Sequence, residues 1–297
     1  MILVAGSTGL LGSEICRQLA AQQKPVRALV RKTSSPEKIN ALTQMGCGLA
    51  EGDFKDKTSL LRACEGCDVV ISTVSSTLSR QEGDNIQTVD HDGNHNLIAA
   101  AKESGIKQFI FISFRHQHAM DNPLTEAKRS AEQTLKSCGM KYTILQASIF
   151  MEVWLSPALG FNYNEHTAQI PGDGTNPISY VSYKDVAAFA AASVDNPVAE
   201  NEVLEIGGAE PLVPAQVIKE FENIRKMHPQ HFFLVPGVGT QGGSLEEISQ
   251  KAMTDDCGIL VNVSRAIIYA SGEKDFAKDA RKVAENYHAE MRSYLKR

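Results

Sequence analysis

The sequence has little that marks a membrane, secreted or nucleic-acid-binding protein. It contains one tryptophan and 6% aromatic residues, and its formal net charge of −5 shows no excess of positive charge. No stretch reaches the roughly 18–20 consecutive apolar residues of a membrane-spanning helix. Residues 1–6 lack the positively charged region and the small-residue cleavage site of a secretory signal. These absences predict a chain with neither a membrane nor a nucleic-acid partner.

Patterns typical of disulfides and metal sites are also scarce. The six cysteines are scattered along the chain, which without a secretory signal is typical of free thiols in a reducing cytoplasm. Cys64 and Cys67 have no second cysteine pair, and His91 and His95 lack the intervening glutamate of the zinc-binding helix motif. We therefore expect a cytoplasmic protein without a bound metal.

The alternation of short strands and helices predicts the fold class. Hydrophobic residues make up 42% of the 297 residues and charged residues 22%, as in a globular protein with a sizeable core. Short β-branched runs alternate with helical patterns, which predicts an α/β fold with a doubly wound parallel sheet. The predicted strands are 2–5, 26–30, 67–73, 107–113 and 142–147, and the predicted helices are 10–22, 36–45, 85–103 and 125–137.

Beyond residue 150 the alternation is looser, and it becomes compact again near the C-terminus. The predicted elements there are strands 178–181, 202–206, 231–235 and 258–263, and helices 183–195, 244–254 and 273–295. The strands at 231–235 and 258–263 each precede a helix, so they form two βα units. We therefore divide the chain into a domain at 1–220 and a segment at 221–297.

A glycine-rich loop lies between the first predicted strand and the first predicted helix. It consists of Gly6, Ser7, Thr8, Gly9, Leu10, Leu11 and Gly12. In such a loop the first glycine permits a tight turn and the second lets the backbone approach a pyrophosphate. The third lets the helix pack against the strand. The position in the first βα turn favours binding of a nicotinamide dinucleotide, and the alternative is a purely structural turn.

The end of the second predicted strand indicates which dinucleotide is bound. A carboxylate about 20 residues after the glycines would hold the ribose 2′-hydroxyl of NAD(H). Here Arg31 and Lys32 stand instead, and two cations suit the 2′-phosphate of NADP(H). The sequence therefore favours NADP(H) over NAD(H), with solvated surface cations as the alternative.

Two further strand ends supply candidate cofactor contacts. After the third strand, Asp53 can accept from the adenine amino group while Phe54 packs on the ring. A turn-forming aspartate beside a core phenylalanine is the alternative there. After the fourth strand, Thr73 and Val74 face the same crevice, because carboxyl ends of parallel strands meet at one edge.

Several motifs resemble those of the NmrA-like atypical short-chain dehydrogenases. They lie at 105–113, 127–132, 142–146, 150–152, 183–187 and 205–208, in addition to the glycine loop. The resemblance extends to about residue 220 and implies a Rossmann-like fold, NADP(H) binding and a cytoplasmic location. It also implies either reductase activity on a small carbonyl or quinone substrate, or a redox-sensing role without catalysis.

The chain departs from the wider dehydrogenase pattern at one position. Members of that group place a tyrosine four residues before an active-site lysine; here Lys128 is present, but Leu124 stands at the tyrosine position. Leucine cannot donate the proton that carbonyl reduction requires. Lys128 is therefore a candidate catalytic residue or a ligand of the nicotinamide ribose. Ser113 is a candidate nicotinamide contact or a strand-end cap.

The last 75 or so residues resemble a different family, orotidine 5′-phosphate decarboxylase. The motifs at 232–243 and 258–269 resemble the last two βα units of that TIM barrel, which form its phosphate grip. The resemblance implies a phosphate site, and the candidate residues are Gly239, Gln241, Gly242, Gly243 and Arg265. The first six βα units of the barrel and its lysine/aspartate array are missing, which argues against decarboxylase activity.

Two resemblances in one chain indicate a fusion, with a natural fusion and an engineered chimera both open. Two βα units cannot close a barrel, so their strands need a partner. We expect them to extend the Rossmann-like sheet or to pair with a second copy in a homo-oligomer. The function predicted for the whole chain is an NADP(H)-binding reductase or non-catalytic binding protein. The alternatives are a chimeric scaffold without turnover and a phosphate-ligand binder.

Overall fold

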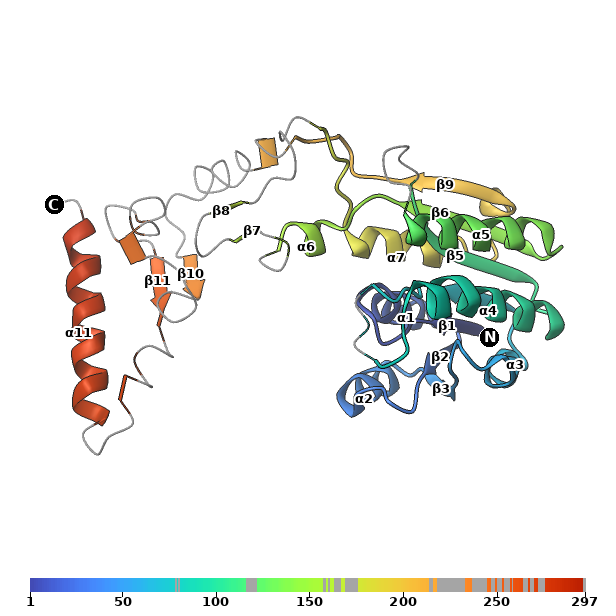
Figure 1. Cartoon of the computed structure of the whole chain (residues 1–297), viewed down its shortest axis with the longest axis horizontal. Coiled ribbons are helices and arrows are strands. Elements are labelled where there is room, and N and C mark those ends of the chain that lie inside the picture. Colours follow the sequence, from blue (N-terminus) through green and yellow to red (C-terminus); the bar gives the residue numbers. More distant parts are fainter. Residues whose placement is uncertain are drawn as a thin grey trace. The chain divides into compact units, whose positions relative to one another are not determined.

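A computed structural model provides the coordinates of the chain, and Figure 1 labels its elements. The described residues are 1–77, 79, 81–115, 122–156, 159, 161–162, 167–168, 176–213, 216–217, 233–236, 245–246, 249, 253, 257, 259–263, 267, 270–271 and 276–295. The chain divides into two compact units. One comprises Met1–Met151 and Ser179–Glu210, and the other comprises Glu152–Ile178 and Pro211–Arg297.

The first unit contains a seven-stranded parallel sheet in the order β3-β2-β1-β4-β5-β6-β9. Its strands are β1 (Ile2–Ala5), β2 (Val26–Val30), β3 (Gly48–Glu51), β4 (Val69–Ser72), β5 (Gln108–Phe114), β6 (Lys141–Ala147) and β9 (Glu202–Ile206). The predicted α/β class with a doubly wound, Rossmann-like sheet is confirmed. The first strand lies between β2 and β4, so the strand order reverses at β1. In such sheets, ligands bind outside the carboxyl ends of the strands at this reversal.

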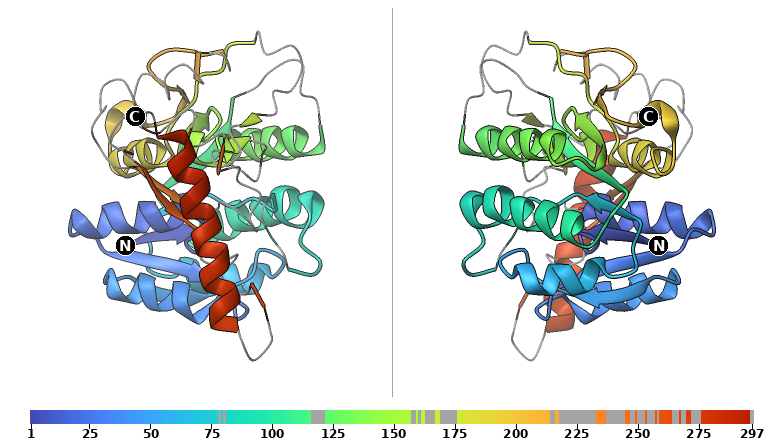
Figure 2. Two further views of the ribbon diagram at one scale, coloured as in Figure 1. Left: turned by 90° about the vertical axis from the view of Figure 1, so that its left-hand side faces the viewer. Right: turned by 90° about the vertical axis from the view of Figure 1, so that its right-hand side faces the viewer.

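Helices cover both faces of this sheet, as the two views of Figure 2 show. They are α1 (Leu10–Ala21), α2 (Pro36–Gln44), α3 (Lys57–Cys64), η1 (Ile86–His91), α4 (Asp92–Glu103), α5 (Pro123–Ser137), α7 (Tyr183–Ala192) and η3 (Pro197–Ala199). One apolar cluster joins Ile2 and Val4 to α1, α2 and α7, and a second joins Leu3 and Ala5 to α3, α4 and α5. Alternate residues of β1 thus enter opposite cores, which explains its uninterrupted apolar sequence.

The helix predicted at 85–103 is present, but its first part is not an α-helix. The segment is helical, but Ile86–His91 forms a π-helix before α4 begins at Asp92. The Asn85 side chain caps this turn by accepting from the Thr88 N–H at 2.9 Å. A π-helical turn shifts the residues it contains around the helix axis, which a regular helical pattern does not predict.

The second unit has small sheets of its own. Its elements are β7 (Phe161–Asn162), β8 (Thr167–Ala168), β10 (Phe233–Pro236), β11 (Ile259–Asn262) and α11 (Phe276–Tyr294), and α6 (Met151–Trp154) begins where the two units meet in the chain. The β10 strand pairs in parallel with β11, from Phe233 opposite Ile259. Among the described strands, this pair is separate from the seven-stranded sheet. The expected extension of the main sheet is therefore not seen among the described strands.

The predicted strand at 178–181 is reduced to two bridges. Ile178 pairs with Leu212, and Val181 pairs with Phe150.

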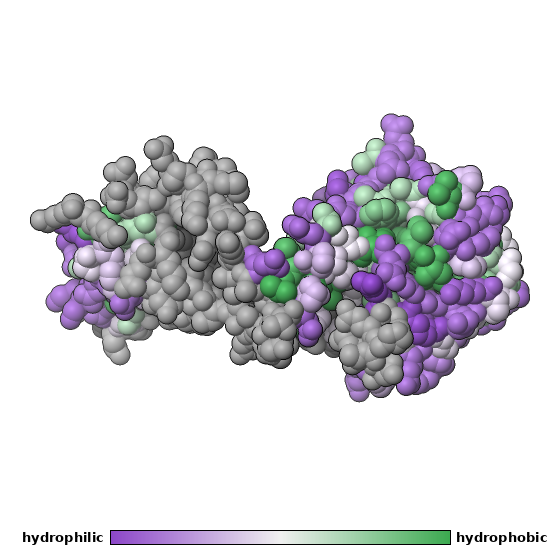
Figure 3. Space-filling view, turned by 90° about the horizontal axis from the view of Figure 1, so that it is seen from above, coloured by the Kyte–Doolittle hydropathy of each residue, from purple (hydrophilic) through white to green (hydrophobic). Residues whose placement is uncertain are grey.

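The surface of the described residues carries hydrophilic side chains interspersed with small hydrophobic areas (Figure 3). Among the described residues, no helix is both long and apolar enough to cross a membrane.

Candidate functional site

The glycine loop closes tightly against the start of the segment that follows β4. Gly6 has a φ of +81°, and a Cβ atom there would lie 2.4 Å from Thr73 Oγ1. A Cβ atom on Gly12 would lie 2.2 Å from the Gly6 carbonyl oxygen. A side chain at position 6 would strain the left-handed backbone, and one at position 12 would clash with the Gly6 backbone, so the loop requires glycine at both.

The loop presents the N-terminus of α1 at the carboxyl edge of the sheet. Gly9 is the N-cap residue, so no side chain caps this helix. The Gly9 N–H donates to the Gly6 carbonyl at 2.9 Å. The first N–H groups of a helix have no partner within the helix, so those of Leu10, Leu11 and Gly12 are oriented to bind an anion. Gly9 and Leu10 are exposed, and Thr8 is half-buried, so this part of the loop is accessible.

Ser7 has a structural role in the loop. Its hydroxyl is fully buried and donates to the Leu29 carbonyl in β2 at 2.7 Å. Leu11 is also buried, in the core cluster that contains Ile15 and Leu19. The loop is thus fixed on its inner side by β2 and the core, while its outer side carries the helix N-terminus.

The residues after β4 connect the glycine loop to Lys128. Thr73 Oγ1 donates to the Ala5 carbonyl at 3.1 Å, and Val74 accepts from Lys128 Nζ at 2.8 Å. Three elements, β1, β4 and α5, therefore bring Gly6, Thr73 and Lys128 to one edge of the sheet. The sequence analysis named Thr73, Val74 and Lys128 as candidate cofactor contacts, but it did not predict the hydrogen bonds between them.

Lys128 is buried beside an aspartate. It is 4% exposed, its ammonium lies 3.7 Å from Asp90 Oδ1, and it lies 5.1 Å from the centre of the Phe111 ring. Burial lowers the pKa of Lys128, and the charge of Asp90 opposes that effect. A lysine held in this way can change protonation state more easily than an exposed one.

Asp90 was missed by the sequence analysis. It lies in η1 and is fully buried, and its Oδ2 accepts from the Ser76 N–H at 2.9 Å and from the Ser76 hydroxyl at 2.6 Å. Among the described residues, Asp90 Oδ1 has no hydrogen-bond partner. Asp90 lies within the helix predicted at 85–103, and the helical pattern gave no signal for it because the π-helical turn changes which way its side chain faces.

Ser113 lies near the C-terminal end of β5, and Leu124 lies at the start of α5. Ser113 is 4% exposed, and its hydroxyl has no hydrogen-bond partner among the described residues. Leu124 is half-buried in the first turn of α5, where its N–H donates to the Asn122 side chain at 3.0 Å. The N-terminal turn of α5 thus places an apolar side chain where the wider dehydrogenase pattern has a phenol.

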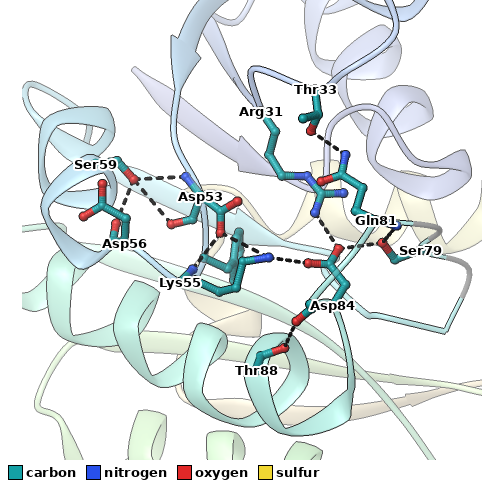
Figure 4. A network of polar contacts seen from close by, with 12 residues as sticks. Arg31, Thr33, Asp53, Lys55, Asp56, Ser59, Ser79, Gln81, Asp84 and Thr88 are labelled. Atoms are coloured by element: carbon teal, nitrogen blue, oxygen red, sulfur yellow. Dashed lines mark hydrogen bonds and ion pairs between the residues drawn. The ribbon is translucent and has the colours of Figure 1, made fainter.

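Arg31 belongs to a cluster of charged residues at the ends of β2 and β3 (Figure 4). Arg31 Nη1 and Lys55 Nζ each lie 2.6 Å from the Asp84 carboxylate, and the Ser79 hydroxyl donates to it at 2.5 Å. Burial alone would raise the pKa of Asp84, but these hydrogen bonds outweigh it and lower the pKa to about 2. Asp84 and Lys55 had no place in the predicted site, because neither is near Arg31 in the sequence.

The second predicted cation, Lys32, faces a different carboxylate. Its ammonium lies 3.5 Å from Glu51 Oε1, and its side chain is 82% exposed. Lys32 is therefore solvated, whereas Arg31 is engaged by Asp84. The solvated state of Lys32 matches the alternative given for it, and contacts of Arg31 and Lys32 with a 2′-phosphate stay a prediction.

Asp53 and Phe54 follow β3. Asp53 Oδ1 accepts from the Lys55 N–H at 2.8 Å, and the Asp53 N–H donates to Ser59 Oγ at 3.0 Å. Phe54 is 7% exposed and packs in the core cluster of α3, α4 and α5. This geometry matches the alternative given for both residues, and contacts of either with adenine stay predictions.

The remaining candidates are the C-terminal phosphate residues and the histidines His91 and His95. Gly239, Gln241, Gly242, Gly243 and Arg265 lie outside the described residues, so their phosphate site stays a prediction. His95 Nε2 lies 3.0 Å from Ser130 Oγ, and the His91 and His95 rings are 4.6 Å apart. Within the described ranges, no group of three or more histidine, cysteine or acidic residues could hold a metal.

The C-terminal segment is similar to a decarboxylase. About 77 residues there are 57% identical to orotidine 5′-phosphate decarboxylase from Parabacteroides distasonis. The match covers 26% of this chain and 28% of the decarboxylase. The predicted resemblance to that family is confirmed for this segment.

The N-terminal part is similar to several proteins of one family. It is 35% identical over 196 residues to the photosystem II assembly factor Ycf39 of Synechocystis, and 30% identical over 219 residues to an NAD(P)H azoreductase of Xenophilus azovorans. These matches cover 65% and 73% of this chain and 58% and 71% of the relatives. The chain thus spans less than two thirds of the length of the Ycf39 factor and of the decarboxylase.

The fold and the family profile agree with these similarities. A quinone oxidoreductase from Escherichia coli, solved with NADPH, superposes with a TM-score of 0.62 at 20% identity, covering 100% of this chain and 91% of that one. The profile of the NmrA-like family matches residues 1–226. The glycine loop, the seven-stranded sheet and the buried Lys128 all lie within the matched residues, and the chain belongs to the NmrA-like family.

Proposed function

We propose that the first unit binds NADP(H) at the glycine loop and reduces a small carbonyl or quinone substrate. The observation that carries this proposal is the fit of the loop to a pyrophosphate. Side chains are excluded at Gly6 and Gly12, and the N-terminus of α1 lies at the point where the strand order reverses.

The other predicted residues are assigned along the same edge of the sheet. Arg31 and Lys32 would bind the 2′-phosphate, while Asp53 and Phe54 would lie at the adenine. On the other side of the loop, the contacts with the nicotinamide half would come from Thr73, Val74, Ser113 and Lys128. When bound, NADPH supplies the hydride for reduction.

Lys128 has two tasks in this proposal. Its ammonium is held by the Val74 carbonyl at 2.8 Å, so it keeps the strand end beside the nicotinamide ribose in place. Since burial lowers its pKa, it is also the group in this site best suited to supply a proton to a reduced oxygen. The likeness to the NAD(P)H azoreductase supports a reductase.

A non-catalytic binding role is the second candidate, and a specific observation favours it. Leu124 replaces the tyrosine that donates a proton in the wider dehydrogenase group. The Lys128 ammonium is already engaged by Val74 and by Asp90. The likeness to the assembly factor Ycf39 also supports a role in which the dinucleotide is bound but not turned over.

Calorimetry with NADP+ and NAD+ tests the cofactor proposal. We expect binding of NADP+ by the intact chain, and a loss of about 100-fold or more in affinity in Gly9→Asp, which sets a carboxylate against the pyrophosphate. Ala21→Asp adds the same charge at the other end of α1 and serves as the matched control. Equal affinities of Gly9→Asp and the parent chain would refute the proposed site.

Turnover separates the two candidate functions. NADPH oxidation measured over a panel of quinones and carbonyl compounds is expected for a reductase. Tight binding of NADPH without oxidation across the panel would favour the non-catalytic role.

We further propose that the chain joins an NmrA-like domain at 1–220 to a decarboxylase-derived segment at 221–297. The change of similarity supports this boundary, since the family profile ends at residue 226 and the decarboxylase match occupies the C-terminal end. The segment lacks most of a barrel, so decarboxylation is not part of the proposed function.

A further inference from the structure

Three loops at the carboxyl edge of the sheet direct donors toward one carboxylate. Arg31 follows β2, Lys55 follows β3, and Ser79 lies in the segment after β4. Their guanidinium, ammonium and hydroxyl groups all contact Asp84, at 2.6, 2.6 and 2.5 Å (Figure 4). The donors therefore converge on a single anion from three separate parts of the chain.

The anion is more buried than its cations. The Asp84 side chain is 1% exposed, whereas those of Arg31 and Lys55 are 33% and 36% exposed. A buried carboxylate must be paired to be stable, and here two cations and a hydroxyl pair with it. The exposed parts of Arg31 and Lys55 leave them accessible to a second anion from solvent.

The donor set is the one that a phosphate monoester prefers. A planar guanidinium binds phosphate oxygens through parallel hydrogen bonds, and an ammonium and a hydroxyl add further donors. Arg31 is also a residue proposed above for the 2′-phosphate. Only Arg31 Nη1 bonds to Asp84, so the other N–H groups of the guanidinium stay available, and the competition is one of charge: a guanidinium and an ammonium already paired with a carboxylate attract a phosphate less.

We infer that Asp84 determines cofactor specificity by competing with the 2′-phosphate of NADP(H) for Arg31 and Lys55. This inference rests on the proposed function. Cofactors with a 2′-phosphate must displace the carboxylate or share its cations, whereas a cofactor with a 2′-hydroxyl need not. Asp84 therefore lowers the preference for NADP(H) that Arg31 would otherwise give.

The local charge balance supports this competition. Arg31, Lys55 and Lys32 carry three positive charges, and Asp84, Asp53 and Glu51 lie within 4.0 Å of them with three negative charges. The cluster is thus neutral as a whole. Removing the charge of Asp84 leaves a net positive site, which attracts a doubly charged phosphate.

Neutralising Asp84 should leave the local fold intact. The backbone beyond it is fixed by the capping box of Asn85 and Thr88, and Thr88 Oγ1 also donates to the Gly83 carbonyl at 2.8 Å. The segment before it is held by Gln81, whose Nε2 donates to Thr33 Oγ1 at 2.5 Å. None of these bonds involves the Asp84 carboxylate.

The test compares adenosine 2′,5′-bisphosphate with 5′-AMP, two ligands that differ only in the 2′-phosphate. Calorimetry on the full chain gives the affinity of each for the parent chain and for Asp84→Asn. We expect Asp84→Asn to bind the bisphosphate about tenfold more tightly, with less than about a twofold change for 5′-AMP. Glu82→Gln is the matched control, because Glu82 is exposed in the same segment and loses the same charge.

Each outcome decides the inference. A rise confined to the bisphosphate and to Asp84→Asn supports competition. An equal rise for both ligands, or an equal rise in Glu82→Gln, would reduce the effect to general electrostatics and overturn it. Weaker binding of the bisphosphate would show that Asp84 positions Arg31 instead. If the parent chain binds neither ligand, the proposed function fails, and the inference fails with it.

Discussion

Two ion clusters flank the candidate cofactor site, and they differ in what is buried. In the inner cluster both charges are buried, since the side chains of Lys128 and Asp90 are 6% and 0% exposed. In the outer cluster only the carboxylate of Asp84 is buried, and its cations are about one third exposed. The inner pair is 3.7 Å apart and Asp90 Oδ1 has no hydrogen-bond partner in the described part of the chain, while the outer contacts are 2.6 Å long.

This difference determines which group has an altered pKa. In the inner cluster, burial lowers the pKa of the lysine, because desolvation disfavours the ammonium more than Asp90 stabilises it. In the outer cluster, burial is outweighed by three donors, and the pKa of Asp84 falls to about 2. Desolvation therefore dominates in the inner cluster, and hydrogen bonding dominates in the outer cluster.

The largest expected effect comes from breaking the inner pair. Lys128→Met leaves the Asp90 carboxylate buried without its cation, so we expect the free energy of unfolding in urea to fall by about 3 kcal/mol. The additional change Asp90→Asn should restore part of that loss, since it removes the unpaired charge. Lys102→Met, on the exposed face of α4, is the control and should change stability little. A loss as small as that of the control would show that the inner pair contributes nothing.

The outer cluster predicts a pH-dependent effect of intermediate size. The pKa of Asp84 lies below its ordinary value of 3.8, at about 2, so its contribution to stability is complete above 3.8 and is lost as pH falls toward 2. The difference in unfolding free energy between the parent chain and Asp84→Asn should therefore shrink by about 2 kcal/mol from about pH 5 to about pH 2. Urea titrations at several pH values measure it. A constant difference would contradict the role of the three donors.

The smallest effect is expected at the exposed pair of Lys32 and Glu51. Both side chains are mostly solvated, at 82% and 58% exposure, and the two charged atoms are 3.5 Å apart. Lys32→Met should change the free energy of unfolding by less than about 0.5 kcal/mol. Thermal or urea unfolding checks this, and a loss close to that of Lys128→Met would show that burial is not what separates the clusters.

Much of the first unit was predictable from the sequence. The strand at 202–206 has the predicted bounds, β6 begins one residue earlier than predicted, and β5 is shifted by one residue at both ends. Apolar strands and capped helices alternate there, so local pattern and final fold agree. The π-helical turn was not predicted, because a helical pattern does not distinguish it from an α-helical turn. The separate β10–β11 sheet was not predicted, because local patterns do not show which strands pair in space.

The candidate site was predictable in part for a related reason. The glycine loop, Arg31 and Lys128 lie at positions where the first βα turns and α5 must place them. Asp84 and Asp90 were missed, since nothing near them in the sequence shows which cation they will face. Their partners Lys55 and Lys128 are 29 and 38 residues away in the chain.

The sequence by itself determined the parallel α/β sheet, the glycine loop that excludes side chains, and the likeness of the two ends of the chain to two families. These follow from periodicity, backbone sterics and local motifs, which need no knowledge of distant residues. Only the tertiary structure decided which carboxylate neutralises which cation. Burial and distance set those interactions, and both arise when loops from different strands meet at one edge of the sheet.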